Sequence, residues 1–244
     1  MSSYFEGAPE RCISGFRFTE GPLWDAGEER LLFSDILASI IYSWRPRAAQ
    51  AEVWRVPSGK SNGLAWSPAG EVLACEHQGR RVSRGGSDHT ATVVDRYRGG
   101  RLNSPNDLVC RPDGCIYFTD PPYGILSEEM GALAEQEQPV NGVYRVTPGS
   151  DTPQLLVRDM ERPNGLAFSP EGDRLYINDT PRYHTRRFRV RTDGTLEDDG
   201  ILAVYPSEQG QGRPDGMKVD VEGNLYTTGP GGLWVVSPAG ELRQ

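Results

Sequence analysis

Long apolar runs and an excess of basic side chains are both missing from this 244-residue sequence. No stretch approaches the roughly 20 apolar residues of a membrane-spanning helix, and residues 1–12 lack the basic region and apolar core of a signal peptide. Acidic residues outnumber basic ones by 34 to 26, which gives a formal net charge of −8. Nucleic acids and anionic membranes bind basic surfaces. We therefore expect neither as a partner and place the protein in the cytoplasm.

Cysteine and histidine are also scarce, with four and three residues. The four cysteines show no C-x-x-C spacing, and a reducing compartment disfavours disulfides, so we expect buried free thiols. Cys110 and Cys115 flank a turn and could still face each other across a hairpin. The cysteines are Cys12, Cys75, Cys110 and Cys115.

Two common catalytic motifs are absent. There is no H-E-x-x-H pattern, and Gly59-Lys60-Ser61 has Trp54 where a phosphate-binding loop would carry its first glycine. Zinc protease and nucleotidase activities are therefore disfavoured.

Glycine and proline, by contrast, are plentiful, and they punctuate a pattern that occurs five times. Each copy has an oxygen-bearing residue, a short strand, a tight turn such as S-P-A-G or R-P-D-G, and a second strand. The copies follow one another at intervals of 42, 44, 58 and 51 residues, close to the length of a propeller blade. The leading residues are Glu20, Asn62, Asn106, Asn164 and Asp215.

The repeat predicts an all-β fold, a single β-propeller domain of four-stranded blades over residues 1–244. Five blades are recognisable, and the last is incomplete. Residues 11–18 are expected to form a strand without a partner. Because a blade has about 40 to 45 residues, we expect the ring to be short of closure by on the order of 50 residues at its C-terminal side, with an open blade edge.

The third repeat is lengthened by residues 124–142. Ser127 and the two acids after it can begin a helix, and Pro139 would end it. This segment either overhangs a site or is a plain surface insertion. Apolar residues recur in or near the first strand of each unit and are expected to form the core between blades. They are Trp24, Trp66, Leu108, Phe168 and Met217.

If the repeats surround an axis, their leading oxygens converge on it. Glu20 and Asp215 bring two charges, and Asn106 and Asn164 bring neutral amide oxygens. Such an all-oxygen set suits a hard divalent cation such as Ca²⁺. The alternative is that Asn and Asp before glycine simply make repeated turns.

Five motifs in this order resemble the gluconolactonase branch of the SMP-30/gluconolactonase family. They are Glu20-Gly21-Pro22, RLNSPND from Arg101, DPPYG from Asp120, PNGLAFSP from Pro163 and RPDGM from Arg213. The resemblance implies a six-bladed propeller that binds one divalent cation on its axis, most readily Ca²⁺, with Mg²⁺, Mn²⁺ and Zn²⁺ as other candidates. It also implies a metal-dependent lactonase.

The resemblance implies Glu20, Asn106, Asn164 and Asp215 as metal ligands, with Asp215 also the general base. It implies Arg101 and Asn103 as substrate contacts, although RLNSPND is longer than the Arg-x-Asn-Asp form of the animal members. Tyr123, in the DPPYG motif, is a further candidate substrate contact.

Three other residues have open roles. Asn62 either lines the channel or makes a turn. Glu76 and His77 end a strand and could reach the same mouth, where His77 would bind substrate or serve as a hydrogen-bonded structural residue.

The expected activity is the opening of a small sugar lactone to its aldonic acid. Two alternatives remain at this stage. The same metal site could hydrolyse a phosphotriester or another ester, or the propeller could be a scaffold that binds a partner on its face, with a purely structural cation.

Overall fold

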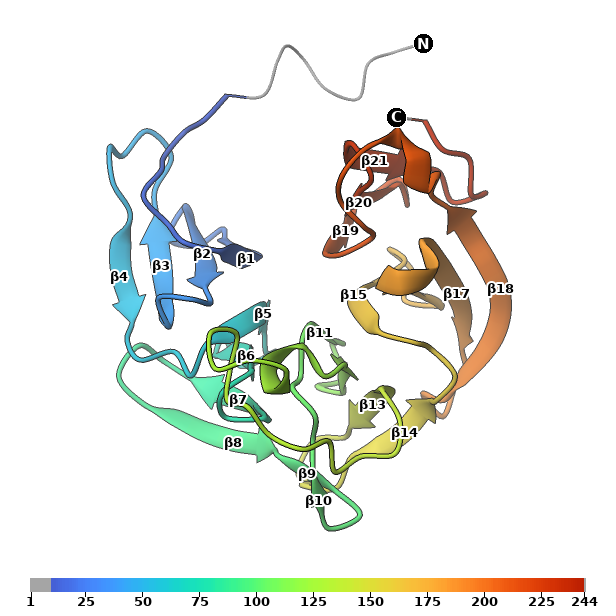
Figure 1. The fold of residues 1–244 in the computed structure, drawn as a ribbon, viewed down its shortest axis with the longest axis horizontal. Helices are drawn as coiled ribbons and strands as arrows, with labels where there is room; N and C mark the ends of the chain where they lie inside the picture. The colour runs from blue at the N-terminus through green and yellow to red at the C-terminus, as the bar shows by residue number, and fades with distance from the viewer. Residues whose placement is uncertain (1–9, 244) are drawn as a thin grey trace.

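The computed structural model describes residues 10–243, and its strands form blades arranged around a central axis (Figure 1). Blade 1 contains β1 (Thr19–Asp25), β2 (Arg30–Asp35), β3 (Ile40–Trp44) and β4 (Glu52–Arg55). Blade 2 contains β5 (Ser61–Trp66), β6 (Val72–Glu76), β7 (Arg81–Gly85) and β8 (Thr90–Val94). Blade 3 contains β11 (Leu108–Cys110), β12 (Ile116–Asp120), β13 (Gly142–Val146) and β14 (Gln154–Val157).

Two further blades and one hairpin complete the described chain. Blade 4 contains β15 (Pro163–Phe168), β16 (Arg174–Asp179), β17 (His184–Val190) and β18 (Leu196–Val204). Blade 5 contains β19 (Met217–Val219), β20 (Leu225–Gly229) and β21 (Gly232–Val236). The hairpin of β9 (Arg96–Tyr97) and β10 (Gly100–Arg101) lies between blades 2 and 3. Each blade is an antiparallel sheet in sequence order, which confirms the predicted all-β propeller.

The hydrophobic core is divided into layers between neighbouring blades. Between blades 2 and 3, for example, Leu73 and Cys75 of β6 pack in one cluster with Phe118 and Tyr144. Of the residues predicted to form this core, Leu108 and Met217 are buried. Trp24 is 48% exposed, so its assignment to the core was wrong. Successive side chains of a strand point to opposite faces, and in β1 it is Leu23 that packs against the cluster between blades 1 and 2.

Near the axis, each blade is tied to the next by the leading residue of its repeat. The backbone amide of Gly63 donates to the carbonyl of Asn106 at 2.9 Å, and that of Gly165 donates to the carbonyl of Asp215 at 3.1 Å. Side chains of the preceding second strands add to these bonds. Ser34 donates to the Asn62 carbonyl, Thr119 to that of Asn164 and Asn178 to that of Asp215. The side chains of the leading residues are therefore displayed from a fixed backbone.

Buried carboxylates at the ends of three second strands anchor the chain that enters each blade. Asp35 accepts from the amides of Arg17 and Phe18, at 2.9 and 3.1 Å. Asp120 accepts from Asn103 in blade 3. Asp179 accepts from the two amides before Pro163 in blade 4. This recurring bond explains why an aspartate ends the second strand in three repeats.

The same bonds overturn one expectation about the N-terminal side. Residues 11–18 were predicted to be a strand, but the first strand begins at Thr19. The amides of Arg17 and Phe18 are used by Asp35 instead of a neighbouring strand, and Phe16 packs edge-on against Phe33 with ring centroids 4.9 Å apart. Residues 16–18 therefore pack against β2 of blade 1 and do not pair with a strand of another blade.

Blades 1 and 5 face each other without a sheet between them within residues 10–243 (Figure 1). After β21 the chain turns back, and Leu242 forms an isolated bridge with Val236. The sequence predicted that closing the ring requires further residues on the C-terminal side, and this stays a prediction.

The insertion in blade 3 does not contain the predicted helix. Its regular structure is limited to one 3₁₀ turn, η1 (Tyr123–Ile125). The Ser127 hydroxyl accepts from the Met130 amide, but the chain then doubles back, because Ala132 and Ala134 donate to the carbonyls of Gly124 and Ile125. In a helix, the amides of Ala132 and Ala134 would instead donate to carbonyls four residues earlier. Among the described residues, no helix is long and apolar enough to cross a membrane.

Candidate functional site

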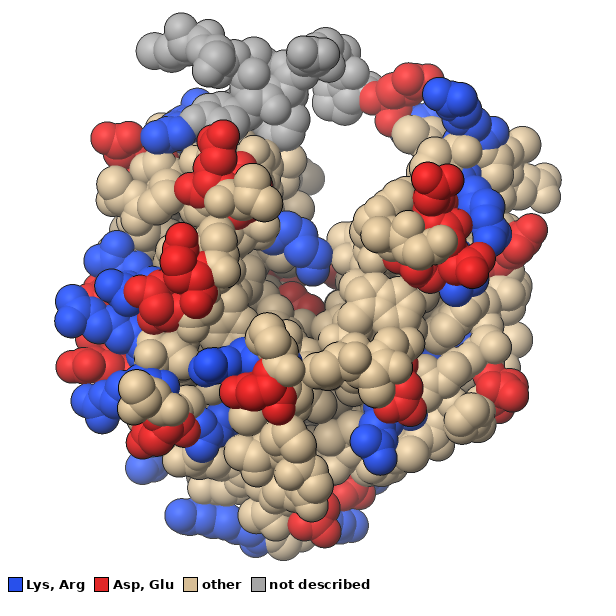
Figure 2. Space-filling view, turned by 180° about the vertical axis from the view of Figure 1, so that it is seen from behind, with Lys and Arg blue, Asp and Glu red and all other residues tan. Residues whose placement is uncertain are grey.

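A cavity of about 820 Å³ opens at the axis and extends into the space between blades 1 and 5. The four predicted metal ligands, Glu20, Asn106, Asn164 and Asp215, all line it, although they come from four different blades. The space-filling view shows the hollow between the two ends of the ring, with acidic and basic side chains mixed around the rim (Figure 2). The repeat therefore places its leading residues around one cavity, and their role as metal ligands stays a prediction.

The carboxylates of this cavity repel one another. Burial, with added repulsion from Asp215 and Asp107, raises the pKa of Glu20 to about 8. Burial and the charge of Asp107 raise the pKa of Asp215 to about 6. The exposed Lys218 ammonium offsets this only in part, since it acts on Glu20 and Asp107. A divalent cation would remove the repulsion that opposes ionisation of these groups.

Two amide groups complete the set, and the scaffold fixes the orientation of one. The Thr180 hydroxyl donates to the carbonyl of Pro214 at 2.7 Å, so its oxygen accepts from Asn164 Nδ2 at 3.1 Å. That leaves Asn164 Oδ1 as the atom offered to the cavity. Among residues 10–243, no group of three His, Cys, Asp or Glu side chains forms a metal cluster. The two carboxylates and two amides therefore form a mixed set, which is the kind that Ca²⁺ accepts.

Asp107 is the site residue that sequence reasoning missed. The leading residue is followed by glycine in blades 1, 2, 4 and 5, but by Asp107 in blade 3. The glycine is required where the next blade passes close by: a Cβ on Gly63 would lie 2.7 Å from the Cα of Asp107, and one on Gly165 would lie 2.3 Å from the carbonyl oxygen of Asp215. Asp107 lines the cavity and is buried, and burial raises its pKa. Aligning the five repeats would have exposed the exception.

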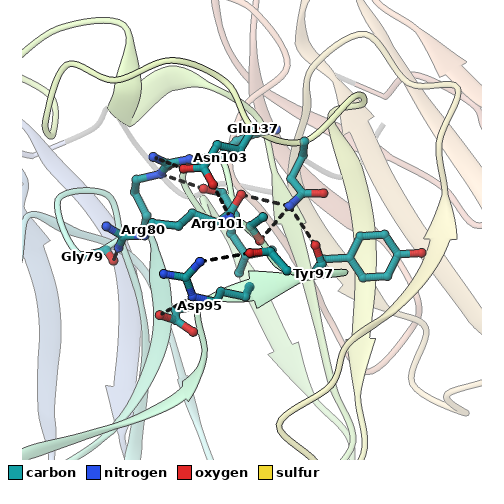
Figure 3. Close-up of polar contacts among 12 residues, drawn as sticks. Gly79, Arg80, Asp95, Tyr97, Arg101, Asn103 and Glu137 are labelled. Carbon is teal, nitrogen blue, oxygen red and sulfur yellow. Dashed lines mark hydrogen bonds and ion pairs between the residues drawn. The ribbon is translucent and has the colours of Figure 1, made fainter.

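Arg101 and Asn103 lie outside the cavity wall, in a polar network over the β9–β10 hairpin (Figure 3). The Arg101 guanidinium donates to the carbonyl of Gly79, and its backbone amide donates to Glu137. Glu137 also pairs with Arg80 at 3.1 Å. Asn103 is fully buried, and its side chain donates to the carbonyl of Asp120 at 2.9 Å. In the described structure both residues hold the loop before β11.

Tyr123 lies closer to the ligand set. Its hydroxyl is buried near Thr180 and Asn164, and burial raises its pKa. The Arg162 guanidinium lies over the ring at 5.6 Å from its centroid. The tyrosine therefore stands behind Asn164, between blades 3 and 4.

The other candidates divide between the cavity and the scaffold. Asn62 lines the cavity. Glu76 is buried and forms an ion pair with Arg81 at 2.7 Å, away from the axis. His77 has no exposed surface and contacts Asn62 from behind.

One sequence pattern near this site does not have its usual meaning. Residues 59–63 fit G-x-S-x-G, the spacing of a hydrolase nucleophile elbow. Ser61, however, lies within β5, is fully buried, and shares a 2.8 Å hydrogen bond with the Ser34 hydroxyl. It is held inside a sheet and not at a strand-to-helix turn, so it is a packing residue.

All four cysteines are free, as predicted. Only Cys75 is fully buried, however, whereas Cys12 is exposed and Cys110 and Cys115 are half-buried. The expectation of burial was therefore wrong for three of them: Cys110 and Cys115 pack only at the edges of the core clusters, and Cys12 lies before the first strand.

Fold and site together define a β-propeller with an acidic, oxygen-lined cavity on its axis. A family model described as the SMP-30/gluconolactonase/LRE-like region matches residues 18–244. A gluconolactonase of Zymomonas mobilis is 33% identical over 253 residues, covering 95% of this chain and 70% of that protein. The chain belongs to the SMP-30/gluconolactonase/LRE-like family.

Solved structures agree with this assignment. A gluconolactonase from Xanthomonas campestris superposes with a TM-score of 0.85 and 35% identity, over 93% of this chain and 75% of that one. Regucalcin from Agrobacterium tumefaciens, described as a calcium-binding protein, has a TM-score of 0.73 at 19% identity, over 95% and 74% of the two chains. The second likeness shows the fold alone.

Proposed function

We propose that the protein hydrolyses a sugar lactone to its aldonic acid, with a divalent cation held by Glu20, Asn106, Asn164 and Asp215. One observation carries the proposal: two carboxylates and two amides from four blades line one cavity in which the carboxylates cannot all ionise readily without a cation. Family membership supports the substrate class, because the related gluconolactonases act on a lactone ester.

The bound ion would act as a Lewis acid toward the lactone carbonyl and would lower the pKa of a water molecule. We propose Ca²⁺, because the donors are all oxygen and come from separate blades. The cavity volume of about 820 Å³ lies within the 300 to 1,000 Å³ range of small-molecule sites.

Asp215 is the proposed general base. Its backbone carbonyl is held by the Gly165 amide and by Asn178 Nδ2 at 2.7 Å, so its carboxylate is presented from a fixed position. It takes a proton from water as the oxygen of that water bonds to the lactone carbonyl carbon. The ring C–O bond then breaks, and the alkoxide leaving group takes up the proton held by Asp215, while the carboxylic acid product loses its proton to solvent. The products are a carboxylate and a free hydroxyl.

The remaining residues are proposed to contribute to substrate binding. Asn62 in the cavity wall is suited to a sugar hydroxyl, and Tyr123, whose buried hydroxyl lies near Asn164, is a further proposed substrate contact. Arg101 and Asn103, which we infer to contribute to substrate binding, would do so through the loop they hold. The free cysteines support a reducing location, and we propose the cytoplasm.

The test is acid release from glucono-δ-lactone, corrected for spontaneous hydrolysis, with and without a chelator. We expect activity that is lost on chelation and restored by Ca²⁺. Activity that is unaffected by the chelator would contradict the metal-dependent mechanism. Turnover of a phosphotriester but of no lactone would contradict the substrate class.

A further inference from the structure

His77 is buried directly behind the cavity wall and is hydrogen-bonded on both sides of its ring. It follows β6 and has no exposed surface. Its Nδ1 lies 3.2 Å from the backbone carbonyl of Met130, in the blade 3 insertion, and its Nε2 lies 3.4 Å from Asn62 Nδ2. The insertion is packed tightly here, since a Cβ on Gly124 would lie 2.6 Å from the His77 Cβ.

The two contacts determine which ring nitrogen carries the proton. A backbone carbonyl only accepts hydrogen bonds, so Nδ1 must carry hydrogen to bond with Met130. Burial lowers the pKa of His77 to about 4, which keeps the ring neutral at physiological pH. A neutral ring has one bare nitrogen, and here that nitrogen is Nε2.

The bare Nε2 in turn determines the orientation of the Asn62 carboxamide. Nε2 accepts a hydrogen bond, so Asn62 presents its NH₂ group to His77. No hydrogen bond within residues 10–243 engages Asn62 Oδ1, and Asn62 lines the cavity. The oxygen is therefore left for the cavity. The Thr180 hydroxyl orients Asn164 in the same manner, by accepting from its NH₂ group.

We propose that His77 is a positioning residue: the Met130 carbonyl selects its Nδ1–H tautomer, and its Nε2 holds Asn62 so that Oδ1 faces the cavity as an acceptor for a substrate hydroxyl. The identity of that hydroxyl rests on the proposed function. The blade 3 insertion would then influence substrate binding, because its Met130 carbonyl orients His77 and His77 orients Asn62.

This arrangement predicts selectivity for a hydroxylated ring. An acceptor at Asn62 bonds a hydroxyl group and is left unpaired by a deoxy analogue at the same carbon. When His77 cannot accept, the carboxamide is free to rotate and to offer NH₂ instead. Binding of the hydroxyl then weakens, whereas the reacting groups around Asp215 are untouched.

The first experiment measures the tautomer by long-range ¹H–¹⁵N NMR of the chelator-treated protein at pH 7. The sequence has three histidines, so His89→Gln and His184→Gln variants assign the signals. We expect the pattern of a neutral Nδ1–H ring for His77, together with a downfield-shifted Asn62 side-chain amide that moves in His77→Phe. A neutral Nε2–H ring would overturn the proposal.

The second experiment separates KM from kcat. We expect His77→Phe to raise KM for glucono-δ-lactone about tenfold, the effect of losing one oriented hydrogen bond, with kcat changed less than about twofold. His77→Gln, whose Oε1 can accept from Asn62, should recover part of the loss. His89→Phe, an exposed residue beside Asp88, should match the parent. The role would be overturned if KM were unchanged in His77→Phe. It would also be overturned if kcat fell as much as KM rose.

Failure of the proposed function and failure of the positioning role can be distinguished. If the parent protein opens no lactone, the proposed function is wrong, and gluconate binding measured by calorimetry takes the place of KM. His77→Phe should then weaken gluconate binding relative to His89→Phe. Equal gluconate affinity in the two variants, or its absence in the parent, would overturn the positioning role.

Discussion

Blades 2 and 3 begin with nearly the same dipeptide but use it differently. In blade 2, Asn62 is followed by Gly63, whose missing side chain lets the chain of blade 3 pass within contact distance. In blade 3, Asn106 is followed by Asp107, which adds a buried carboxylate to the cavity. The comparison shows that this axial position allows close packing in blades 1, 2 and 4 and adds a carboxylate to the cavity in blade 3.

Removal of the proposed base should have the largest effect. Asp215→Asn keeps the size of the side chain but removes a proton acceptor and a ligand charge, so we expect kcat for glucono-δ-lactone to fall by about 10² to 10⁴-fold. Steady-state kinetics at saturating Ca²⁺ measure the change. Parent-like kcat in a correctly folded variant would exclude Asp215 as the base.

The packing role of the axial glycines should appear as lost stability. In Gly165→Ala the new Cβ would lie 2.3 Å from the Asp215 carbonyl oxygen and 2.8 Å from the Cα of Gly216. We expect destabilisation of about 1 to 3 kcal/mol or more, because backbone must move. Gly216→Ala is the matched control, since no atom lies within 4 Å of its Cβ position. Urea unfolding compares the two, and equal midpoints would contradict the explanation.

The chemical role of Asp107 should appear in the pH dependence of the metal-free protein. The pKa of Glu20 is about 8 in the folded chain against an ordinary value of 4.5, and that of Asp215 is about 6 against 3.8. Between these values the folded state binds more protons at Glu20 and Asp215 than the unfolded chain does, so the contribution of these two groups to stability falls as pH rises from about 4 to 8.

Asp107→Asn removes one of the repelling charges while keeping the side chain's shape. We expect it to reduce this loss of stability in chelator, and to weaken Ca²⁺ binding because the cavity holds less negative charge. Thermal unfolding across pH 4 to 8, with and without Ca²⁺, measures both effects. Saturating Ca²⁺ should flatten the parent's profile, since a ligand of the folded state offsets the repulsion. The same slope in parent and variant would count against Asp107.

The smallest effect is expected outside the cavity. Arg101→Ala removes the hydrogen bond to the Gly79 carbonyl, which contributes about 0.5 to 1.5 kcal/mol to stability. We expect KM to rise modestly as the loop before β11 loosens, with kcat nearly unchanged. A large loss of kcat would show that Arg101 reaches the reacting groups, contrary to its position here.

Several features of the protein could be read from the repeat alone. The period, the paired strands and the turn after each first strand predicted the propeller, and the leading oxygens predicted the residues that line the cavity. These are local patterns that recur, so each copy supports the others. Trp24 was misassigned because adjacent side chains of a strand point to opposite faces, and in blade 1 it is Leu23 that packs into the layer next to blade 2.

The sequence by itself determined the blades and the order in which oxygen-bearing side chains reach the axis, because strand alternation and turn chemistry act over a few residues. Only the tertiary structure decided how those side chains are used. Asp107 became a third carboxylate of the cavity because the packing of the blades buries it within range of the charges of Glu20 and Asp215. His77 Nδ1 bonds the backbone carbonyl of Met130, 53 residues away in the sequence. The two atoms meet only because the insertion folds back over blade 2.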